Sequence, residues 1–438
     1  MEWWLVLTII FGSLAFLLLL GVPVAITFLL IDIVGVYLLW GGSTGLKQLV
    51  LNMFDSVSVF SLLPIPMFLF MGEIMFRSGL GFRVFDTLAK WLGKLPGRLS
   101  LMSVGSGTLF GILCGSSVAS TSLLGSLLVP EMNKRGYNHA MSVGPILGSA
   151  GLAILIPPTA LGVLLASLGG FPVGDFLIAI VVPGLLLALA YLLYIIVRCM
   201  LQPGLAPVYE VETYSWRERW IDTVKYILPL GLILFLVLGV IIFGIATPTQ
   251  SAVLGALGSL LLAACYGQLS LKILKESLEG TLRVTGMIFL IMAGSMAFSQ
   301  ILSFTGATQG ILNAVKQWDL SALPMLICIQ LILLLLGCFM EPLSIMMMTL
   351  PILMPIAALY DFHPLWFGAL ILMNMQMATA TPPFGMDLFA MKAVAPNLRM
   401  GEIYRAVLPF LGLNLLVMAA MILFPWITLW LPGLMRQG

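Results

Sequence analysis

Charged residues are scarce in this chain. Only 9% of its 438 residues are Asp, Glu, Lys or Arg, whereas 61% are hydrophobic. A soluble domain of this length could not bury so many apolar side chains, so the composition excludes an ordinary soluble protein. The formal net charge of +2 is also too small to indicate a nucleic-acid partner. The chain is therefore predicted to be an integral membrane protein in contact with the lipid bilayer.

The residues and motifs of common catalytic sites are also few. The chain has two histidines, His139 and His363, and it lacks HExxH, Walker and GxSxG motifs. Its five cysteines form no CxxC pair and show no spacing typical of a metal site or a disulfide framework. The sequence therefore predicts that the protein is not an enzyme.

Long apolar runs are present in abundance. The segments "WLVLTIIFGSLAFLLLLG" after Trp3 and "YILPLGLILFLVLGVIIFG" after Lys225 are two of them. At about 1.5 Å per residue, each can cross a hydrocarbon core of about 30 Å. Ten-residue segments of alternating hydrophobicity, which indicate an outer-membrane barrel, are absent. The predicted fold class is an all-α polytopic membrane protein.

Several features recur 225 positions apart, which indicates an internal repeat. The pairs are Pro23 with Pro248, Leu46-Lys47 with Leu271-Lys272, Pro130 with Pro355, and Pro157-Pro158 with Pro382-Pro383. Such agreement at varied positions is hard to obtain without duplication. The one long polar stretch lies between the halves. We therefore predict a first repeat over 1–202, a linker over 203–222 and a second repeat over 223–438.

Each half contains two apolar stretches that are too close for an aqueous loop between full crossings. Only "CGSS" separates them in the first half and "GCFMEP" in the second. We predict a re-entrant hairpin near 98–130 and another near 321–356. Five crossings per half then remain, and an odd number gives tandem repeats opposite topology in the membrane. The basic residues are too evenly spread to orient the termini.

Each half also carries a double proline inside an apolar run. Two prolines remove two backbone donors and force the preceding residue out of the helical region. The helices near 140–170 and 365–395 are therefore predicted to break near Ile156 and Thr381. Taken alone, either break is better explained by a simple kink. A break beside a hairpin in both halves favours a transport site, where a cavity can satisfy the freed carbonyls.

Polar side chains near these breaks and hairpin turns are candidates for binding the solute. Hydroxyls, carbonyls and the positive ends of half-helices suit a small cation together with an anionic solute. Glu341 is a candidate as an acid in an apolar hairpin, unless it is solvated at the tip. Asp387 is either a substrate contact or a helix N-cap. The predicted substrate-binding residues are Ser116, Ser117, Ser120, Thr159, Glu341, Asn374, Thr379 and Asp387.

Four segments in order give the chain a family resemblance. They are "GSSVASTSLLGSLLVPEMNKRGY", "ILIPPT", "ATPTQSAVLGAL" and "TPPFGMDLF". Together they resemble the large membrane subunit of tripartite ATP-independent periplasmic (TRAP) transporters, over nearly the whole chain. The resemblance implies a sodium-coupled secondary transporter of organic acids in the bacterial inner membrane, with an elevator-type transport domain and a scaffold. It also implies two partners, a small membrane (Q) subunit and a soluble periplasmic substrate-binding (P) subunit.

The resemblance further implies two sodium sites, formed mostly by backbone carbonyls. Carried over to this chain, they comprise Gly111, Cys114, Ala153, Ile156 and Pro158 in the first half and Gly337, Ala378, Thr381 and Phe384 in the second. Two positions depart from the family pattern. Cys114 stands where a serine is common, which puts one hydroxyl ligand in doubt. Gln250 stands where glutamate usually follows "TPT".

Two other functions remain open from the sequence. One is a stand-alone sodium- or proton-coupled organic-anion antiporter of the wider group of inverted-repeat elevator transporters, which needs no partner. The other is a channel or assembly scaffold, which needs no paired ion sites. The sequence names neither the organic acid nor the number of sodium ions.

Overall fold

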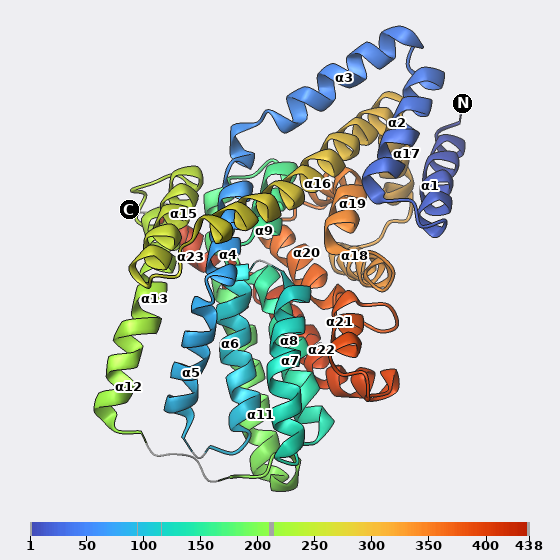
Figure 1. Cartoon of the computed structure of the whole chain (residues 1–438). Helices are drawn as coiled ribbons and strands as arrows, with labels where there is room; N and C mark the ends of the chain where they lie inside the picture. The colour runs from blue at the N-terminus through green and yellow to red at the C-terminus, as the bar shows by residue number, and fades with distance from the viewer. Residues whose placement is uncertain (1, 94, 115, 210–213, 436–438) are drawn as a thin grey trace.

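The computed structural model describes residues 2–93, 95–114, 116–209 and 214–435, without the side chains of residues 19, 81, 82, 110 and 112–114. All regular secondary structure in these residues is helical (Figure 1). The helices of the first half are α1 (Trp3–Leu19), α2 (Val24–Leu39), α3 (Ser43–Val57), α4 (Pro64–Arg77), α5 (Leu80–Leu92), α6 (Arg98–Cys114), α7 (Ser117–Lys134), α8 (His139–Leu155), α9 (Ala160–Gly169), α10 (Val173–Ala179) and α11 (Val181–Leu201).

The second half begins with a helical segment that contains two π-helical turns. Helix α12 (Trp216–Asp222) starts inside the predicted linker and continues into this segment. The remaining helices are α13 (Leu228–Leu234), α14 (Val240–Ile242), α15 (Pro248–Cys265), α16 (Leu271–Phe304), α17 (Ala307–Gln317), α18 (Ala322–Gly337), α19 (Pro342–Leu359), α20 (Pro364–Ala378), α21 (Met386–Val394), α22 (Met400–Leu423) and α23 (Trp426–Met435). Helices α7 and α19 begin and end 225 positions apart, as do the starts of α8 and α20.

Seven helical segments of the described residues are long and apolar enough to cross a membrane, or eight if the bent pair α8 and α9 forms one span. The seven are Phe60–Arg77, Val173–Leu201, Trp216–Ile242, Pro248–Cys265, Leu271–Phe304, Pro342–Leu359 and Met400–Leu423. Five shorter apolar helices accompany them. The chain is thus a multi-pass helical membrane protein, as its composition predicts.

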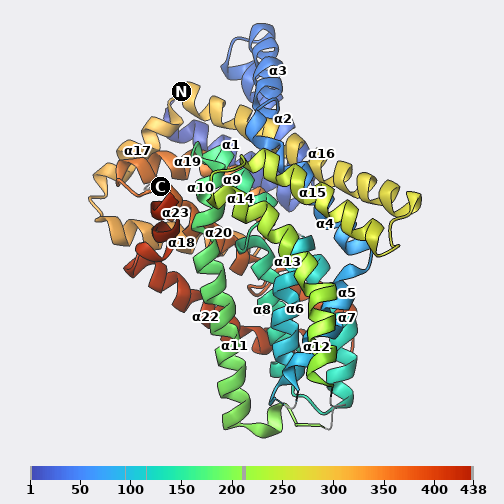
Figure 2. The ribbon, with the colours of Figure 1, turned by 90° about the vertical axis from the view of Figure 1, so that its left-hand side faces the viewer.

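The helices form two packed groups. In one group, the long helix α16 crosses the molecule obliquely and packs against α2, α3 and α4, and α15 packs against α4 (Figures 1 and 2). In the other, α8 is central and packs against α6, α7, α11, α20 and α22. The two groups meet where α4 contacts α6 and α9, and where α16 contacts α19. The functional candidates lie near this junction.

The halves differ at the amphipathic segments that follow α2 and α15. The sequence predicts an interfacial helix in each half, at "LKQLVLNMFDSV" and "LKILKESLEGTLRV". The first segment is the separate helix α3, but the second is only the start of α16. Pro64 and Pro66 begin a new helix in the first half, whereas the positions 225 later are Phe289 and Ile291. Without a proline at these positions, the helix continues.

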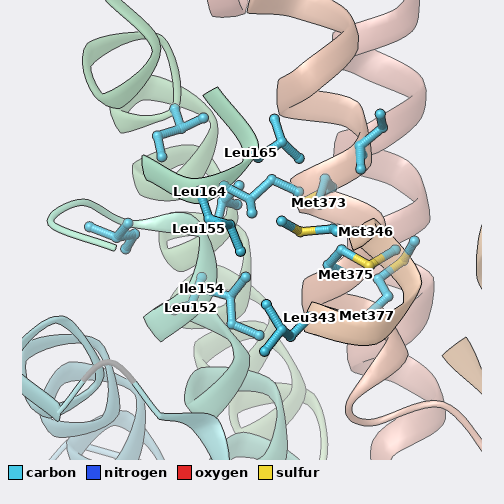
Figure 3. Packing of buried hydrophobic residues seen from close by; sticks show 14 of the residues in the cluster. Leu152, Ile154, Leu155, Leu164, Leu165, Leu343, Met346, Met373, Met375 and Met377 are labelled. Carbon is cyan, nitrogen blue, oxygen red and sulfur yellow. The ribbon is translucent and has the colours of Figure 1, made fainter. Parts of the chain in front are cut away.

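The core joins both halves of the chain. Leucine and isoleucine side chains of α8 and α9 face leucine and methionine side chains of α19 and α20 (Figure 3). Leu155 and Met346 are both fully buried there. Methionine has three rotatable bonds and fills irregular gaps, which suits packing around broken helices. This core holds the two proline breaks side by side.

Candidate functional site

The first break lies between α8 and α9, whose axes differ by 44°. Ile156 leaves the helical region, with φ −88° and ψ 120°, as expected before a proline. Pro157 and Pro158 have no N–H, so the carbonyls of Ala153 and Ile154 lose their helical donors. Thr159 restarts the chain as the N-cap of α9, where its hydroxyl accepts the Gly162 N–H at 3.4 Å. The predicted break near Ile156 is present.

The second break lies between α20 and α21. Helix α20 ends at Ala378, and the chain turns through 379–385 before Met386. The Thr381 carbonyl accepts the Gly385 N–H at 3.1 Å. Tyr404 of α22 donates its hydroxyl to the Pro383 carbonyl at 2.8 Å, which ties the turn to the neighbouring helix. The predicted break near Thr381 is therefore also present, and it spans more residues than the first.

A glycine of each predicted hairpin touches an alanine next to each break. A Cβ placed on Gly111 of α6 would lie 2.9 Å from the Cβ of Ala153. A Cβ placed on Gly337 of α18 would lie 2.4 Å from the Cβ of Ala378. Real Cβ atoms do not approach so closely, so glycine is required at both positions. Two residues of each predicted sodium set are thereby brought into contact.

Helices α7, α9 and α19 begin in the same region. Their first residues are typical of helix N-termini. Ser116 is the N-cap of α7, and its hydroxyl accepts the Ala119 N–H at 3.3 Å. Pro342 is the first residue of α19, a position where proline costs no helical hydrogen bond. With α9, these starts direct free N–H groups and the positive ends of helix dipoles toward the same region, each equivalent to about half a charge.

These helix starts line a cavity of about 460 Å³. Its lining includes Ser116 and Ser117 of α7, Ala160 and Leu161 of α9, Glu341 to Leu343 at the start of α19, and Thr379 and Met386 at the second break. The opposite wall consists of α4 and α16. The cavity thus lies at the junction of the two helix groups. Its volume suits a small organic molecule.

Asp387 lies immediately behind this lining. Its side chain is fully buried, and neither carboxylate oxygen has a hydrogen bond of standard geometry. The hydroxyls of Ser117 and Thr379, both in the cavity wall, are its polar neighbours. Gly385, not Asp387, is the N-cap residue of α21. The N-cap interpretation of Asp387 is therefore wrong, and its carboxylate faces residues that line the cavity.

The other predicted site residues are distributed unevenly. Asn374 is buried and donates to the Gln330 carbonyl at 2.8 Å, away from the cavity lining. Ser120 is fully buried with an unpartnered hydroxyl. Pro158 is buried, whereas the Phe384 side chain is 54% exposed, with its ring centre 5.6 Å from that of Phe339 and the two rings tilted by 39°. Cys114 ends α6, and its side chain lies outside the part of the chain that the structure describes.

The hydroxyls of the second break bond within their own helix. Thr381 donates to the Met377 carbonyl at 2.7 Å, and Thr379 donates to the Gln376 carbonyl at 3.0 Å. The hydroxyl oxygens available to an ion at this break therefore each already donate one hydrogen bond to a backbone carbonyl. Thr379 lines the cavity, while Thr381 does not.

Two polar clusters near the site were not singled out by the sequence. In the cavity wall, Arg77 of α4 contacts Glu73 at 2.7 Å and Glu276 of α16 at 3.3 Å. Within the core, Tyr191 donates to the Asn414 side chain at 2.8 Å, and Gln376 approaches its hydroxyl at 3.5 Å. The i,i+4 spacing of Glu73 and Arg77 could have predicted their pairing. The Tyr191 contacts join distant segments and left no local signal.

The arrangement places oxygen atoms and helix N-termini around a partly open cavity and provides no cluster of strong metal ligands among the described residues. The described residues contain no group of three His, Cys, Asp or Glu side chains able to hold a metal ion. Carbonyls, hydroxyls and isolated carboxylates are ligands for hard cations such as alkali and alkaline-earth ions. The site can therefore bind a small polar solute, with any cation held mainly by oxygen.

Comparison with known proteins gives consistent matches over the whole chain. The family model described as "Tripartite ATP-independent periplasmic transporter, DctM component" matches residues 11–427. The ectoine TRAP transporter large permease protein TeaC of Halomonas elongata is 29% identical over 98% of this chain and 99% of its own length. The C4-dicarboxylate TRAP transporter large permease protein DctM of Pseudomonas aeruginosa is 32% identical over 88% of this chain and 90% of its own.

A solved structure shares the fold at lower sequence similarity. The crystal structure of the YdaH transporter of Alcanivorax borkumensis, described as having an unusual topology, superposes with a TM-score of 0.60 at 16% identity. It covers 89% of this chain and 91% of that protein. At this identity the likeness concerns the fold alone.

Proposed function

The chain belongs to the DctM family of tripartite ATP-independent periplasmic transporters, and we propose that it moves an organic acid across the bacterial inner membrane, driven by a sodium gradient. The family membership makes it a large membrane permease subunit of a secondary transporter, and not an enzyme. Its relatives are named for C4-dicarboxylates and for ectoine, so the substrate class proposed here is organic acids.

The observation that carries this proposal is the cavity of about 460 Å³ between the two helix groups. Helix starts from both halves of the chain meet there, namely those of α7 and α9 from the first half and of α19 from the second. Helix N-termini stabilise anions, so a carboxylate fits this place. Transporter sites are typically built from discontinuous helices in this way.

The repeated bounds of the helices support two inverted repeats. Helix α7 with α19, and the starts of α8 and α20, recur at the offset of the paired prolines, and α8 and α20 each end at a break. In an elevator mechanism, α6 to α9 and α18 to α21 would move together as the transport domain. The group of α2, α4, α15 and α16 would be the stationary scaffold. The cavity lies between these two groups, where such a movement would carry its content across.

Two sodium sites are proposed beside the breaks. In the first, the Ala153 carbonyl has lost its helical donor to Pro157, and Gly111 brings the backbone of α6 against it. In the second, Gly337 brings α18 against Ala378 in the same manner. Backbone oxygens held by close contacts between helices suit a weakly bound cation that must also leave. Sodium is then a co-transported substrate.

Two partners are proposed with this chain. They are a small membrane subunit and a soluble periplasmic protein that captures the organic acid and delivers it. A relative named as the isethionate TRAP transporter permease protein DctMQ, from Oleidesulfovibrio alaskensis, is 28% identical over 98% of this chain but only 66% of its own length.

Reconstituted transport tests the proposal. The large and small subunits are placed in liposomes with the cognate binding protein outside, and uptake of labelled organic acids is measured with an inward sodium gradient, a proton gradient or neither. We expect saturable uptake that needs both sodium and the binding protein. Equal uptake driven by protons alone would contradict sodium coupling. Full-rate uptake of free solute without the binding protein would instead support the stand-alone antiporter.

A further inference from the structure

More acidic than basic side chains line the cavity, and this excess limits which solutes can bind there. Two acidic side chains, Glu73 and Glu341, line it, and Arg77 is the one basic side chain among the described lining residues. Arg77 is already shared between Glu73 and Glu276. Its Nε and Nη1 atoms thus face carboxylates of the protein, and Glu276 also lies 4.0 Å from Lys272. A carboxylate of the solute would compete with Glu73 and Glu276 for this guanidinium.

The wall formed by α19 and α21 contains Glu341 and, behind the lining, Asp387. Glu341 is half-buried at the start of α19, and its carboxylate accepts a hydrogen bond from the Ser344 hydroxyl at 3.2 Å. Asp387 is fully buried behind Ser117 and Thr379, and neither of its oxygens has a hydrogen bond of standard geometry from the described residues. The polar surroundings of Asp387 are the Ser117 and Thr379 hydroxyls and the first turn of α21, with no cation beside it in the part of the chain that the structure describes. A buried carboxylate is costly, so a bound group that donates hydrogen bonds or carries positive charge would be favoured.

Positive potential at the cavity comes from backbone rather than from side chains. The starts of α7, α9 and α19 provide it, and each is equivalent to about half a positive charge. Together they suit a single carboxylate. A second carboxylate would have to approach Glu341 or Asp387, and juxtaposed like charges are strongly disfavoured.

Building on the proposed function, we infer that the transported acid is zwitterionic, with a carboxylate at the start of α9 and a cationic group facing Glu341 and Asp387. Simple dicarboxylates are then poor substrates. The carboxylate at Asp387 acts as the specificity-determining group. Ser117, which lines the cavity in front of it, passes on this preference, because a hydroxyl that donates to Asp387 can accept a hydrogen bond from the solute.

Ligand-dependent thermal stability of the purified full chain in sodium-containing detergent solution tests this inference. The zwitterionic probes are proline, glycine betaine and 4-aminobutanoate. Succinate, malate and glutarate are the dicarboxylate probes, and succinate matches 4-aminobutanoate in chain length. We expect at least one zwitterion to raise the unfolding temperature and the dicarboxylates to leave it unchanged.

Two variants test whether the zwitterion binds beside Asp387 and Glu341. Asp387→Asn and Glu341→Gln should each weaken binding of the stabilising zwitterion by at least tenfold. Asp32→Asn is the matched control, because Asp32 of α2 is equally buried but, unlike Asp387, has neither of the lining hydroxyls of Ser117 and Thr379 as a polar neighbour. It should leave the zwitterion affinity within about twofold of the parent. If Asp387→Asn does not fold, Glu341→Gln still tests the cationic subsite.

The outcomes separate this inference from the proposed function. If a dicarboxylate stabilises the chain and the zwitterions do not, the inference is overturned while sodium-driven transport of organic acids stands. If all three acidic variants lose the zwitterion equally, the loss is structural and the assignment to Asp387 and Glu341 fails. If no zwitterion stabilises the chain, the inference also falls. Failure of every solute in reconstituted uptake would overturn the proposed function itself.

Discussion

Gly337 and Ala378 are so close that no other residue fits at position 337. A Cβ there would lie 2.4 Å from the Ala378 Cβ and 3.1 Å from its Cα. This contact presses the end of α18 against the end of α20, directly before the second break. The same relationship between Gly111 and Ala153 holds α6 against α8. Both contacts set the position of backbone oxygens that the proposed sodium sites would use.

Substitution of Gly337 should therefore disturb the second sodium site. Gly337→Ala has to separate α18 from α20, and overpacking of this kind costs about 1–3 kcal/mol of folding free energy. We expect a lower unfolding temperature and a higher sodium concentration for half-maximal uptake. Gly412→Ala is the control, since no atom lies within 4 Å of a Cβ at that helical position. An unchanged sodium requirement in Gly337→Ala would show that the contact has no part in ion binding.

The two threonines of the second break should differ in what they affect. Thr379 lines the cavity and faces Asp387, so Thr379→Ala should weaken solute binding. Thr381 lies outside the cavity lining and within the proposed sodium set, so Thr381→Ala should raise the sodium requirement. Loss of one oxygen ligand costs about 1–3 kcal/mol. Uptake at varied sodium and solute concentrations separates the two effects. If Thr379→Ala raises the sodium requirement and Thr381→Ala does not, the ion site lies elsewhere.

The buried contacts of Tyr191 should stabilise the helix group around α8. Its hydroxyl joins Asn414 of α22 to Gln376 of α20. Tyr191→Phe leaves buried amides without a partner, at a cost of about 1–3 kcal/mol. We expect a lower unfolding temperature in detergent. Tyr194→Phe is the matched control one helical turn away, because its hydroxyl makes no hydrogen bond among the described residues. Equal stability of the two variants would refute this role.

Gln250 departs from the usual glutamate but performs the same local task. Its side-chain oxygen accepts the Thr247 N–H at 2.9 Å, and the Thr247 hydroxyl accepts the Gln250 N–H at 3.3 Å. This reciprocal pair is a capping box at the start of α15. Gln250→Glu should preserve stability, whereas Gln250→Ala should lower it by about 0.5–2 kcal/mol. Thermal unfolding of both variants is the measurement, and a loss in Gln250→Glu would show that the amide has another role.

Local chemistry determined much of this protein before any packing was known. Apolar runs of sufficient length predicted a helical membrane protein, because backbone polar groups in hydrocarbon must bond within the segment. The double prolines predicted both breaks, because proline lacks an N–H in any surroundings. The second half has no proline at positions 289 and 291, which correspond to Pro64 and Pro66. This difference could have predicted that α16 is unbroken, because the break depends on local residues alone.

Only the tertiary structure decided what gathers around the cavity. Asp387, Ser117 and Glu341 are far apart in the sequence, and packing of α7, α19 and α21 brings them to one place. The same packing engaged Asn374 with Gln330 and so removed it from the cavity lining. A residue's type shows which bonds it can make, but its partners depend on how distant helices are placed. That placement is set by the summed contacts of the whole core, which no short segment encodes.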